Sequence, residues 1–214
     1  MYIPPSFRVE DRETLHAFME RYSFATLVSI RSDAPFATHL PLLLDRDRNT
    51  LLGHLARGNP HAEALGGGEW LAVFSGPHAY VSPSWYAVAP AVPTWNYAVV
   101  HAYGTPRKLS ADRTRTVVDE TVRRYESTRD QPWANDLPEE YRQRMLDGVV
   151  GFEMPILRIE GKFKLGQNRD GQDRAGMVDG LMRDGAEARL LADLITKHFA
   201  AEAPGRSQGS TEPR

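Results

Sequence analysis

The segment His54-Leu-Ala-Arg57-Gly-Asn59-Pro60-His61 places two histidines and an arginine around the start of a short helix. Asn59 is a favourable N-cap and Pro60 a favourable first helical residue, so backbone N–H groups of this turn are expected to be free. A helix N-terminus beside cationic side chains attracts anions, and the segment predicts a seat for a phosphate group. The alternative is a capped surface helix with solvated basic side chains, because no glycine-rich phosphate motif accompanies the turn.

A second region is rich in aromatic side chains. A flat ligand is typically bound by aromatic or apolar walls, with a few hydroxyl and amide groups for its polar edge. The same composition is typical of a barrel core or a subunit interface, and both interpretations stay open. Prolines at positions 77, 83, 90 and 93 favour irregular loops, which carry function more often than packing. The aromatic residues are Phe74, Tyr80, Trp85, Tyr86, Trp95, Tyr97 and Tyr103.

A third segment, at 161–169, reads GKFKLGQNR. Lys162 and Lys164 share one face of a strand, and a polar cluster follows them. Such a group could meet a phosphate, a nucleobase edge or a flavin ring, or could be an edge strand protected by lysines. The sequence contains none of the motifs of serine hydrolases, zinc proteases, P-loops or Rossmann dinucleotide sites. Its histidines are scattered, so no metal site is expected.

Composition restricts the class of protein further. The 214 residues include no cysteine, which excludes disulfides, thiolate zinc sites, iron–sulfur clusters and a cysteine nucleophile. The 26 Lys and Arg against 28 Asp and Glu give a net charge of −2, which argues against a general polyanion binder. With 41% hydrophobic and 25% charged residues, the composition is that of an ordinary globular protein that can bury a core.

The two ends of the sequence carry no targeting signal that we recognise. MYIPPSFRVEDRE lacks the basic segment and apolar run of a signal peptide, and no stretch is apolar enough for a membrane span, so a cytoplasmic protein is expected. Residues 1–200 are expected to form a single domain. Residues 201–214 are expected to be a disordered tail, because Gly, Ser and Pro dominate from Ala203 onward.

Apolar periodicity predicts the elements that position these residues. Strands at 24–30, 36–44 and 50–54 are expected to form a three-stranded antiparallel meander. Strands come first and helices are inserted or appended, which indicates a mainly β (α+β) fold, an antiparallel barrel or sheet with peripheral helices. Asp184 and Glu187 have capping-box spacing at the start of the last predicted helix. The remaining predicted elements are strands at 70–75, 78–82, 94–109 and 149–165, and helices at 11–22, 112–127 and 184–199.

Five blocks of sequence, in order, carry a resemblance to a known family. They are MYIPPSF at 1–7, HLARGNPH at 54–61, VSPSWY at 81–86, VPTWNYAVVHAYG at 92–104 and FKLGQNR at 163–169. In these blocks the chain resembles the PaiB family of FMN-binding negative transcriptional regulators, which have the FMN-binding split-barrel fold. The resemblance extends from Met1 to about Phe199.

The resemblance implies a six-stranded antiparallel Greek-key split barrel, working as a homodimer with two FMN sites at the subunit interface. It also implies a set of cofactor-binding residues. Thr38, His39, Leu40 and Pro41 would line the flavin ring, and His54, Leu55, Ala56 and Arg57, with Asn59 and His61, would hold the ribityl phosphate. Ser82, Trp85, Thr94, Trp95 and Asn96 would close the pocket, some from the partner subunit, and Lys164, Gln167 and Asn168 would complete it.

The sequence departs from the family pattern at two places. Gly166 stands where a serine is expected in a K-L-S-Q-N block, which removes a hydroxyl contact. The segment at 87–91 is short and uncharged where related sequences tend to carry a basic residue.

Three functions stay open. The first is an FMN-binding regulator of the PaiB type that acts through flavin binding rather than a recognisable DNA-binding motif. The second is an FMN-dependent oxidoreductase, a flavin reductase or pyridoxamine-oxidase-like enzyme, using a nicotinamide cofactor, in which the flavin would supply the chemistry and no catalytic residue is assigned. The third is a degenerate dimer without flavin.

Direct DNA binding is disfavoured. A recognition helix needs a basic face, and the best candidate lies at 112–127. Its arginines are balanced by acidic residues, which predicts a solvated amphipathic helix. The charged residues are Arg113, Arg115, Arg123 and Arg124 against Asp112, Asp119, Glu120 and Glu126.

Overall fold

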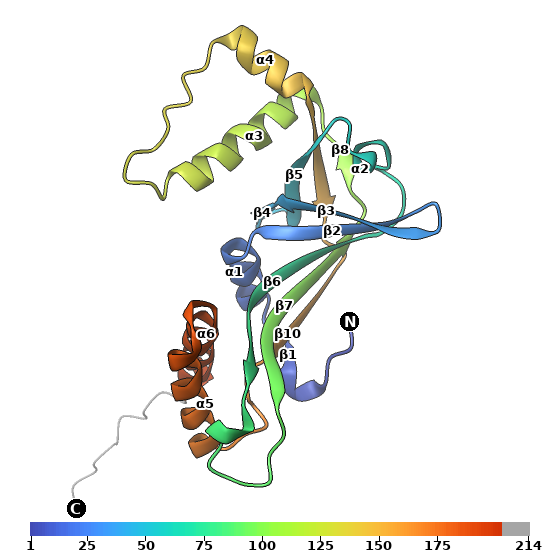
Figure 1. The fold of residues 1–214 in the computed structure, drawn as a ribbon. Coiled ribbons are helices and arrows are strands. Elements are labelled where there is room, and N and C mark those ends of the chain that lie inside the picture. Colours follow the sequence, from blue (N-terminus) through green and yellow to red (C-terminus); the bar gives the residue numbers. More distant parts are fainter. Residues whose placement is uncertain (203–214) are drawn as a thin grey trace, which may run out of the picture. The chain divides into compact units, whose positions relative to one another are not determined.

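The structure is a computed structural model that describes residues 1–202 (Figure 1). The chain divides into two compact units. The first comprises Met1–Ile3, Arg8–Gly76 and Val99–Lys162, and the second comprises Pro4–Phe7, Pro77–Ala98 and the chain from Phe163 onward. Of the predicted tail, residues 201 and 202 belong to the last helix, and the remainder lies outside the described residues.

The strands form two antiparallel sheets. A six-stranded sheet has the order β1-β10-β7-β6-β2-β3, and a four-stranded sheet has the order β4-β5-β9-β8. The division between the two units falls within β6, β7 and β10. The strands are β1 (Arg8–Val9), β2 (Phe24–Arg31), β3 (Ala34–Pro41), β4 (Leu43–Asp45), β5 (Thr50–Ala56), β6 (Trp70–Val81), β7 (Thr94–Gly104), β8 (Arg107–Lys108), β9 (Val149–Pro155) and β10 (Arg158–Lys164).

Along the chain, the helices are inserted between the strands or follow them, as the predicted α+β class requires. The first unit holds α1 (Arg12–Arg21), α2 (Pro60–Glu63), α3 (Ala111–Glu126) and α4 (Glu139–Asp147). The second unit holds η1 (Pro5–Phe7), η2 (Pro83–Trp85), α5 (Gly171–Asp184) and α6 (Ala186–Glu202). The mainly β fold with antiparallel sheets and peripheral helices is therefore confirmed. Among the described helices, none is both long enough and apolar enough to cross a membrane.

In the first unit, β2 shows the two-residue alternation expected of a half-buried strand. Ala25, Leu27 and Ser29 are buried, whereas Phe24 and Ile30 are 67% and 69% exposed. The buried face thus carries the smaller side chains. The exposed face of this hairpin strand presents two large apolar groups to solvent.

The core of each unit comes from residues that alternate along strands or recur along helices. Each fully buried large apolar side chain contributes roughly 1.5–3 kcal/mol. In the first unit these side chains include Leu15, Met19, Leu27, Leu51, Leu55, Trp70, Phe74, Phe152 and Met154. In the second unit they include Leu165, Met177, Leu181, Leu191 and Ile195.

The predicted meander is wrong in its middle strand. The stretch expected as one strand at 36–44 is divided into β3 and β4, which belong to different sheets. The reason lies at Pro41 and Leu42. Pro41 pairs with Phe24 as the last residue of β3 and has no N–H with which to continue the ladder. Leu42 is buried, and its N–H donates to the Ser23 carbonyl, which turns the chain toward the second sheet.

Other element boundaries also differ from expectation. The two strands predicted at 70–75 and 78–82 are one strand, β6, whereas those predicted at 94–109 and 149–165 are each divided in two. The capping box at Asp184 is wrong, because Asp184 is the last residue of α5 and Arg189 N–H bonds to the Gly185 carbonyl instead. Helices α4 and α5 were not predicted, since their apolar residues are sparse.

Candidate functional site

In the first unit, four predicted or neighbouring polar residues form one hydrogen-bonded group. His61 is fully buried, with Nε2 3.0 Å from Ser29 Oγ and Nδ1 2.9 Å from Thr38 Oγ1. Asn59 Nδ2 donates to the same Thr38 hydroxyl over 3.0 Å. We call Ser29, Thr38, Asn59 and His61 the His61 network. Because both ring nitrogens of His61 are occupied, its role in this network is to position Thr38 and Asn59.

The surroundings of His61 keep it neutral. Its ring packs edge-on against Phe36, with ring centroids 4.7 Å apart. It also packs against Trp70, with ring centroids 4.4 Å apart. Burial lowers the pKa of His61, and the nearby Arg31 charge lowers it further. A neutral imidazole between two hydroxyls donates one hydrogen bond and accepts the other, so it fixes the geometry of the network.

The turn before α2 has the predicted cap but few free donors. The Asn59 side chain accepts from His61 N–H, and Pro60 occupies the first turn. Arg57 N–H donates to the Gly148 carbonyl, and Asn59 N–H to Ala56. Most of the backbone N–H groups expected to be free therefore already donate hydrogen bonds within the protein. Anion binding here depends on side chains.

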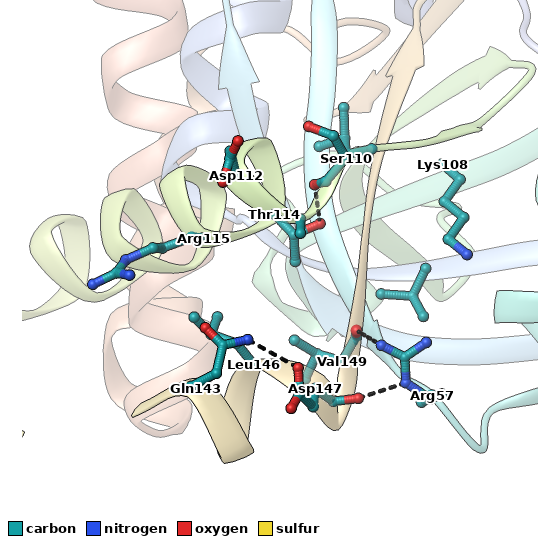
Figure 2. Close-up of a pocket in the computed structure, with 13 residues that line it drawn as sticks. Arg57, Lys108, Ser110, Asp112, Thr114, Arg115, Gln143, Leu146, Asp147 and Val149 are labelled. Carbon is teal, nitrogen blue, oxygen red and sulfur yellow. Dashed lines mark hydrogen bonds between the residues drawn. The ribbon is translucent and has the colours of Figure 1, made fainter. Parts of the chain in front are cut away.

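Arg57 is held from behind by the junction between α4 and β9. Its Nε donates to the Asp147 carbonyl, and Nη2 donates to the Val149 carbonyl over 3.1 Å (Figure 2). A guanidinium has five N–H donors, so three remain for a ligand. Arg57 lines a pocket of about 400 Å³ together with Lys108 and the first residues of α3.

Lys108 is a candidate that sequence reasoning did not single out. It is exposed, and it places a second cation on the pocket that Arg57 lines. The signal for it is the adjacent basic pair Arg107-Lys108, separated from the end of β7 by two residues. Arg115 lines the same pocket, but its guanidinium is paired with Glu139 over 2.7 Å.

The other predicted residues of the first unit lie near these groups without joining them. His39 is exposed on β3, with Nδ1 3.0 Å from Thr26 Oγ1. Leu40 and Leu55 are buried, Pro41 is half-buried and Ala56 is exposed. His54 is half-buried and lines a different pocket, with residues of α3 and α4. Thr38, Asn59 and His61 are thus brought together, and Arg57 and His54 point to separate pockets.

In the second unit, the end of β10 is fixed by local hydrogen bonds. Lys164 Nζ donates to Thr94 Oγ1, which joins two predicted residues. The Gln167 side chain accepts from Leu165 N–H over 2.8 Å and donates to the Phe163 carbonyl over 2.6 Å, so it closes the turn. Asn168 is exposed.

The departure at Gly166 has a local cause. Gly166 has a φ of +90°, a backbone conformation that side chains with a Cβ rarely adopt. A Cβ there would lie 2.8 Å from the Met177 methyl group. A serine at this position would be strained in this chain, and the glycine fits the turn that Gln167 closes.

Ser82 and Trp85 belong to a loop that packs on α5. Ser82 caps η2, and its Oγ lies 2.7 Å from Ser84 Oγ. Trp85 lies directly against α5, because a Cβ at Gly180 would overlap its indole and one at Gly176 would overlap its carbonyl. The two glycines, one helical turn apart, thus give Trp85 its place.

Asp173 is a positioning residue that the sequence did not indicate. It is 3% exposed and accepts hydrogen bonds from Ala87 N–H at 2.8 Å and Val88 N–H at 3.3 Å. Its other oxygen accepts from Arg169, whose guanidinium lies over the Tyr86 ring. The short uncharged segment at 87–91 is therefore anchored at its start by a buried carboxylate.

Trp95 and Asn96, neighbours in sequence, have opposite environments. Asn96 is buried, with Nδ2 3.0 Å from Met177 Sδ. Trp95 is 54% exposed, and its ring lies 6.1 Å from that of His78 and 6.4 Å from that of Tyr80. The second unit therefore presents an aromatic surface beside a polar strand end, which suits a flat ligand with a polar edge.

Comparison with known families decides the relationship of this chain. Residues 1–158 match the family model described as “Putative FMN-binding domain”. The chain belongs to this family. The matched range includes the predicted residues from Thr38 to Asn96 and ends before Lys164, Gln167 and Asn168.

Individual relatives agree with the family assignment. The chain is 36% identical over 200 residues to “Protease synthase and sporulation protein PAI 2” of Bacillus subtilis, covering 91% of this chain and 96% of the relative. This confirms the resemblance to the PaiB family. An uncharacterised protein of Aspergillus fumigatus is 31% identical over 207 residues, covering 72% of this chain and 78% of the relative.

Solved structures support the fold. The FAD and heme binding protein from Mycobacterium smegmatis superposes with a TM-score of 0.60 at 18% identity, over 78% of each chain. The flavocytochrome Anf3 from Azotobacter vinelandii superposes with a TM-score of 0.55 at 16% identity, over 79% of this chain and 75% of its own. The predicted split-barrel fold class is confirmed.

Proposed function

We propose that the protein binds FMN non-covalently as a homodimer and acts, like the PaiB-type regulators it resembles, through flavin binding rather than through a DNA-binding motif of its own. The observation that carries the proposal is the fixed guanidinium of Arg57 beside Lys108, in a chain of an FMN-binding family. When bound, FMN would supply redox and light-absorbing chemistry that no amino-acid side chain here can provide.

The donors of the first unit fit a phosphomonoester. Within residues 1–202, three N–H groups of Arg57 have no protein acceptor after its two bonds to carbonyls. Lys108 adds a positive charge to the same pocket, whose lining also includes Asp112 and Asp147. Charge-assisted hydrogen bonds of this kind are about twice as strong as neutral ones. Because Arg57 is already oriented by the Asp147 and Val149 carbonyls, little side-chain entropy is lost on binding.

The ring of the flavin calls for the other kind of surface. Trp95 and Tyr80 are 54% and 44% exposed, and Lys164 and Thr94 form a polar pair at the adjoining strand ends. The proposal includes a homodimer, in which each subunit contributes one set of phosphate-binding residues and one set of ring-binding residues.

The exposed face of β2 supports self-association. Phe24 and Ile30 stand on it, and their β3 partners Pro41 and Pro35 continue it across the hairpin. We expect Ile30→Asp to convert a dimer into a monomer in light scattering at micromolar concentration. Leu157→Asp changes a residue of similar exposure, 68%, outside this face and should leave the dimer intact. A wild-type monomer would contradict this part of the proposal.

Direct contact with DNA receives no support from α3. Arg115 is paired with Glu139, and Arg124 donates to the Glu20 carbonyl. Two of the four arginines that could have formed a basic face are thus engaged within the protein. A sequence-specific gel shift at low salt would overturn this part of the proposal.

The decisive experiment compares FMN with riboflavin, which has the same ring and no phosphate. Flavin is removed, and each compound is titrated into wild type, Arg57→Ala and the control Arg144→Ala, which changes an exposed arginine of α4. Arg57→Ala should weaken FMN binding by about 1.5–3 kcal/mol, the contribution of hydrogen bonds to a charged group, and leave riboflavin binding unchanged.

Each outcome decides the proposal. Wild type that binds neither compound would overturn flavin binding. An equal loss for FMN and riboflavin in Arg57→Ala would remove Arg57 from the phosphate site. Reduction of the bound flavin by NADH or NADPH with multiple turnovers would indicate an oxidoreductase instead of a regulator.

A further inference from the structure

A second pocket of the first unit shares Leu146 and Val149 with the pocket that Arg57 lines. It has a volume of about 180 Å³, and we call it the His54 pocket. Its walls come from α3, the connection that follows α3, and α4. Most of its lining is apolar, including Val118, Val122, Trp133, Leu137, Met145 and Val149. A mostly apolar wall with a few convergent polar groups is typical of small-molecule sites.

Arg142 brings one polar group to this pocket. Its Nη2 donates to the Asn135 carbonyl over 2.7 Å, and Nη1 lies 4.0 Å from an Asp119 carboxylate oxygen. Its Nε is buried and has no hydrogen-bond partner in the described part of the chain. A buried N–H without an acceptor is destabilising, so an acceptor supplied by a ligand would be favourable. The guanidinium is therefore held through Nη2, and its buried Nε–H lacks an acceptor.

His54 brings the other polar group. It is half-buried, and among residues 1–202 no hydrogen bond to its ring is found. Burial lowers the pKa of His54, so the ring is neutral at pH 7 and offers one donor and one acceptor. One buried N–H without a partner, on Arg142, and the ring of His54 thus line the same apolar pocket, which is what a site for a partly polar ligand requires.

Volume and charge restrict the ligand. A dry apolar cavity of about 150 Å³ is known to accept benzene, so the His54 pocket has room for one ring and a small substituent. Asp119 and Arg142 lie at the pocket as an ion pair, and His54 is neutral, so the local charge sums to zero. A charged ligand would be left without a counter-ion in an apolar site.

We propose that the His54 pocket binds an uncharged, one-ring aromatic molecule whose oxygen accepts a hydrogen bond from Arg142 Nε, with His54 contacting the same polar end. Benzamides and phenols are the chemical class that fits. The site is independent of the flavin proposal, because none of its argued contacts involves Arg57, Lys108 or the aromatic surface of the second unit.

The test uses the full-length protein, freed of any flavin, and benzamide as the probe. Binding is measured by calorimetry and by ligand-observed NMR. A ligand of this size is expected to bind with a Kd on the order of 0.1–1 mM. Benzoate, the charged analogue of the same shape, should bind at least about tenfold more weakly. If no benzamide binding is detected at about 10 mM, tenfold above the upper end of this Kd range, the proposal is overturned.

Variants place the probe. Arg142→Lys keeps the charge and removes Nε–H, and Val122→Phe fills the pocket; each should weaken benzamide binding at least about tenfold. Arg144→Lys makes the same chemical change on an exposed residue of the same helix and should have no effect. If Val122→Phe fails to fold, judged by circular dichroism, Leu137→Phe replaces it.

The remaining outcomes are equally clear. Unchanged binding in the filled variants would place benzamide elsewhere and overturn the proposal. Benzoate binding as tightly as benzamide would overturn the assignment of an uncharged ligand. Flavin binding by Arg142→Lys at the wild-type level is expected, and it separates failure of this site from failure of the flavin site.

Discussion

The two sets of predicted site residues differ in how their polar groups are satisfied. In the first unit, Thr38, Asn59 and His61 bond to one another, and Arg57 bonds to two carbonyls. In the second unit, large side chains such as Trp95 on β7 stay exposed, and the loop at 87–88 that precedes this strand is anchored by the buried carboxylate of Asp173.

The difference indicates two ways of preparing a surface for a ligand. The phosphate site that we propose needs donors at fixed positions, and in the first unit the Asp147 and Val149 carbonyls fix the guanidinium of Arg57. A flat ring needs apolar area more than direction, and the second unit exposes aromatic side chains of β6 and β7, such as Tyr80 and Trp95. Substitutions in the first set should therefore act on stability first, whereas exposed residues of the second set can change with little effect on folding.

The largest effect is expected at His61. His61→Ala removes a fully buried ring and leaves the Ser29 and Thr38 hydroxyls without their partner. We expect the free energy of unfolding in urea to fall by about 3–4 kcal/mol, from lost packing and unsatisfied hydroxyls. The exposed His39→Ala is the control, with a change within about 0.5 kcal/mol. Equal effects of the two substitutions would remove the contrast between network and surface.

Next in size is the anchor of the second unit. Asp173→Asn replaces one oxygen by an amide that faces Arg169, so the loop at 87–88 or the arginine loses its acceptor. A loss of about 2 kcal/mol in unfolding free energy is expected. Asp179→Asn changes an exposed carboxylate of the same helix and should be nearly neutral. A neutral Asp173→Asn would show that the loop does not depend on this anchor.

A loss of similar size is expected at Gly180. A methyl group there would overlap the Trp85 indole, so Gly180→Ala should cost about 1–3 kcal/mol by overpacking, and the Trp85 resonances should shift in NMR spectra. Gly171→Ala is matched on the same helix, has open space around its Cβ and should stabilise by up to about 1 kcal/mol. Stabilisation by both changes would place Trp85 away from α5.

The smallest change in stability is expected for an exposed aromatic residue. Trp95→Ala should alter the unfolding free energy by no more than about 0.5 kcal/mol. The same variant should lose affinity for FMN and for riboflavin alike, since it would remove a ring contact and not a phosphate contact. A selective loss of FMN binding would assign Trp95 to the wrong end of the cofactor.

Lowering the pH tests the difference between the two units without any substitution. Burial lowers the pKa of His54, His61 and His101, all in the first unit, below the usual value of 6.5. Below pH 6.5 these histidines bind protons in the unfolded chain more readily than in the folded chain, so the free energy of unfolding falls as the pH decreases. Above pH 6.5 their full contribution to stability is present. Urea titrations at pH 8 and pH 5.5 should show this loss, and His61→Asn should reduce it. Stability that rises on acidification would contradict the assignment.

Sequence reasoning recovered what depends on local pattern. The cap and first residue of α2, and the existence of β7 and α3, follow from residue types a few positions apart. Family resemblance supplied the split-barrel class, which periodicity alone left as a barrel or decorated sheet.

What escaped prediction depends on partners distant in the sequence. The break at Leu42 requires Ser23, the seat of Trp85 requires Gly176 and Gly180, and Asp173 serves a segment more than eighty residues earlier. The pattern HLARGNPH likewise suggested one cluster of basic groups. The strand pleat and the α4–β9 junction divide that cluster between two pockets and a buried network.

The grip on Arg57 has a consequence for how the protein folds. The carbonyls that hold its guanidinium lie 90 and 92 residues further along the chain, whereas β2 and β3 pair across a tight turn. Contacts so distant in sequence carry a large loop-closure cost and form after local hairpins. The β3 residues predicted to line a flavin ring are thus expected to pair early, and Arg57, which we propose to bind the phosphate, is oriented only when β9 docks. A nascent chain released before Val149 would already contain the hairpin and would have no oriented anion receptor.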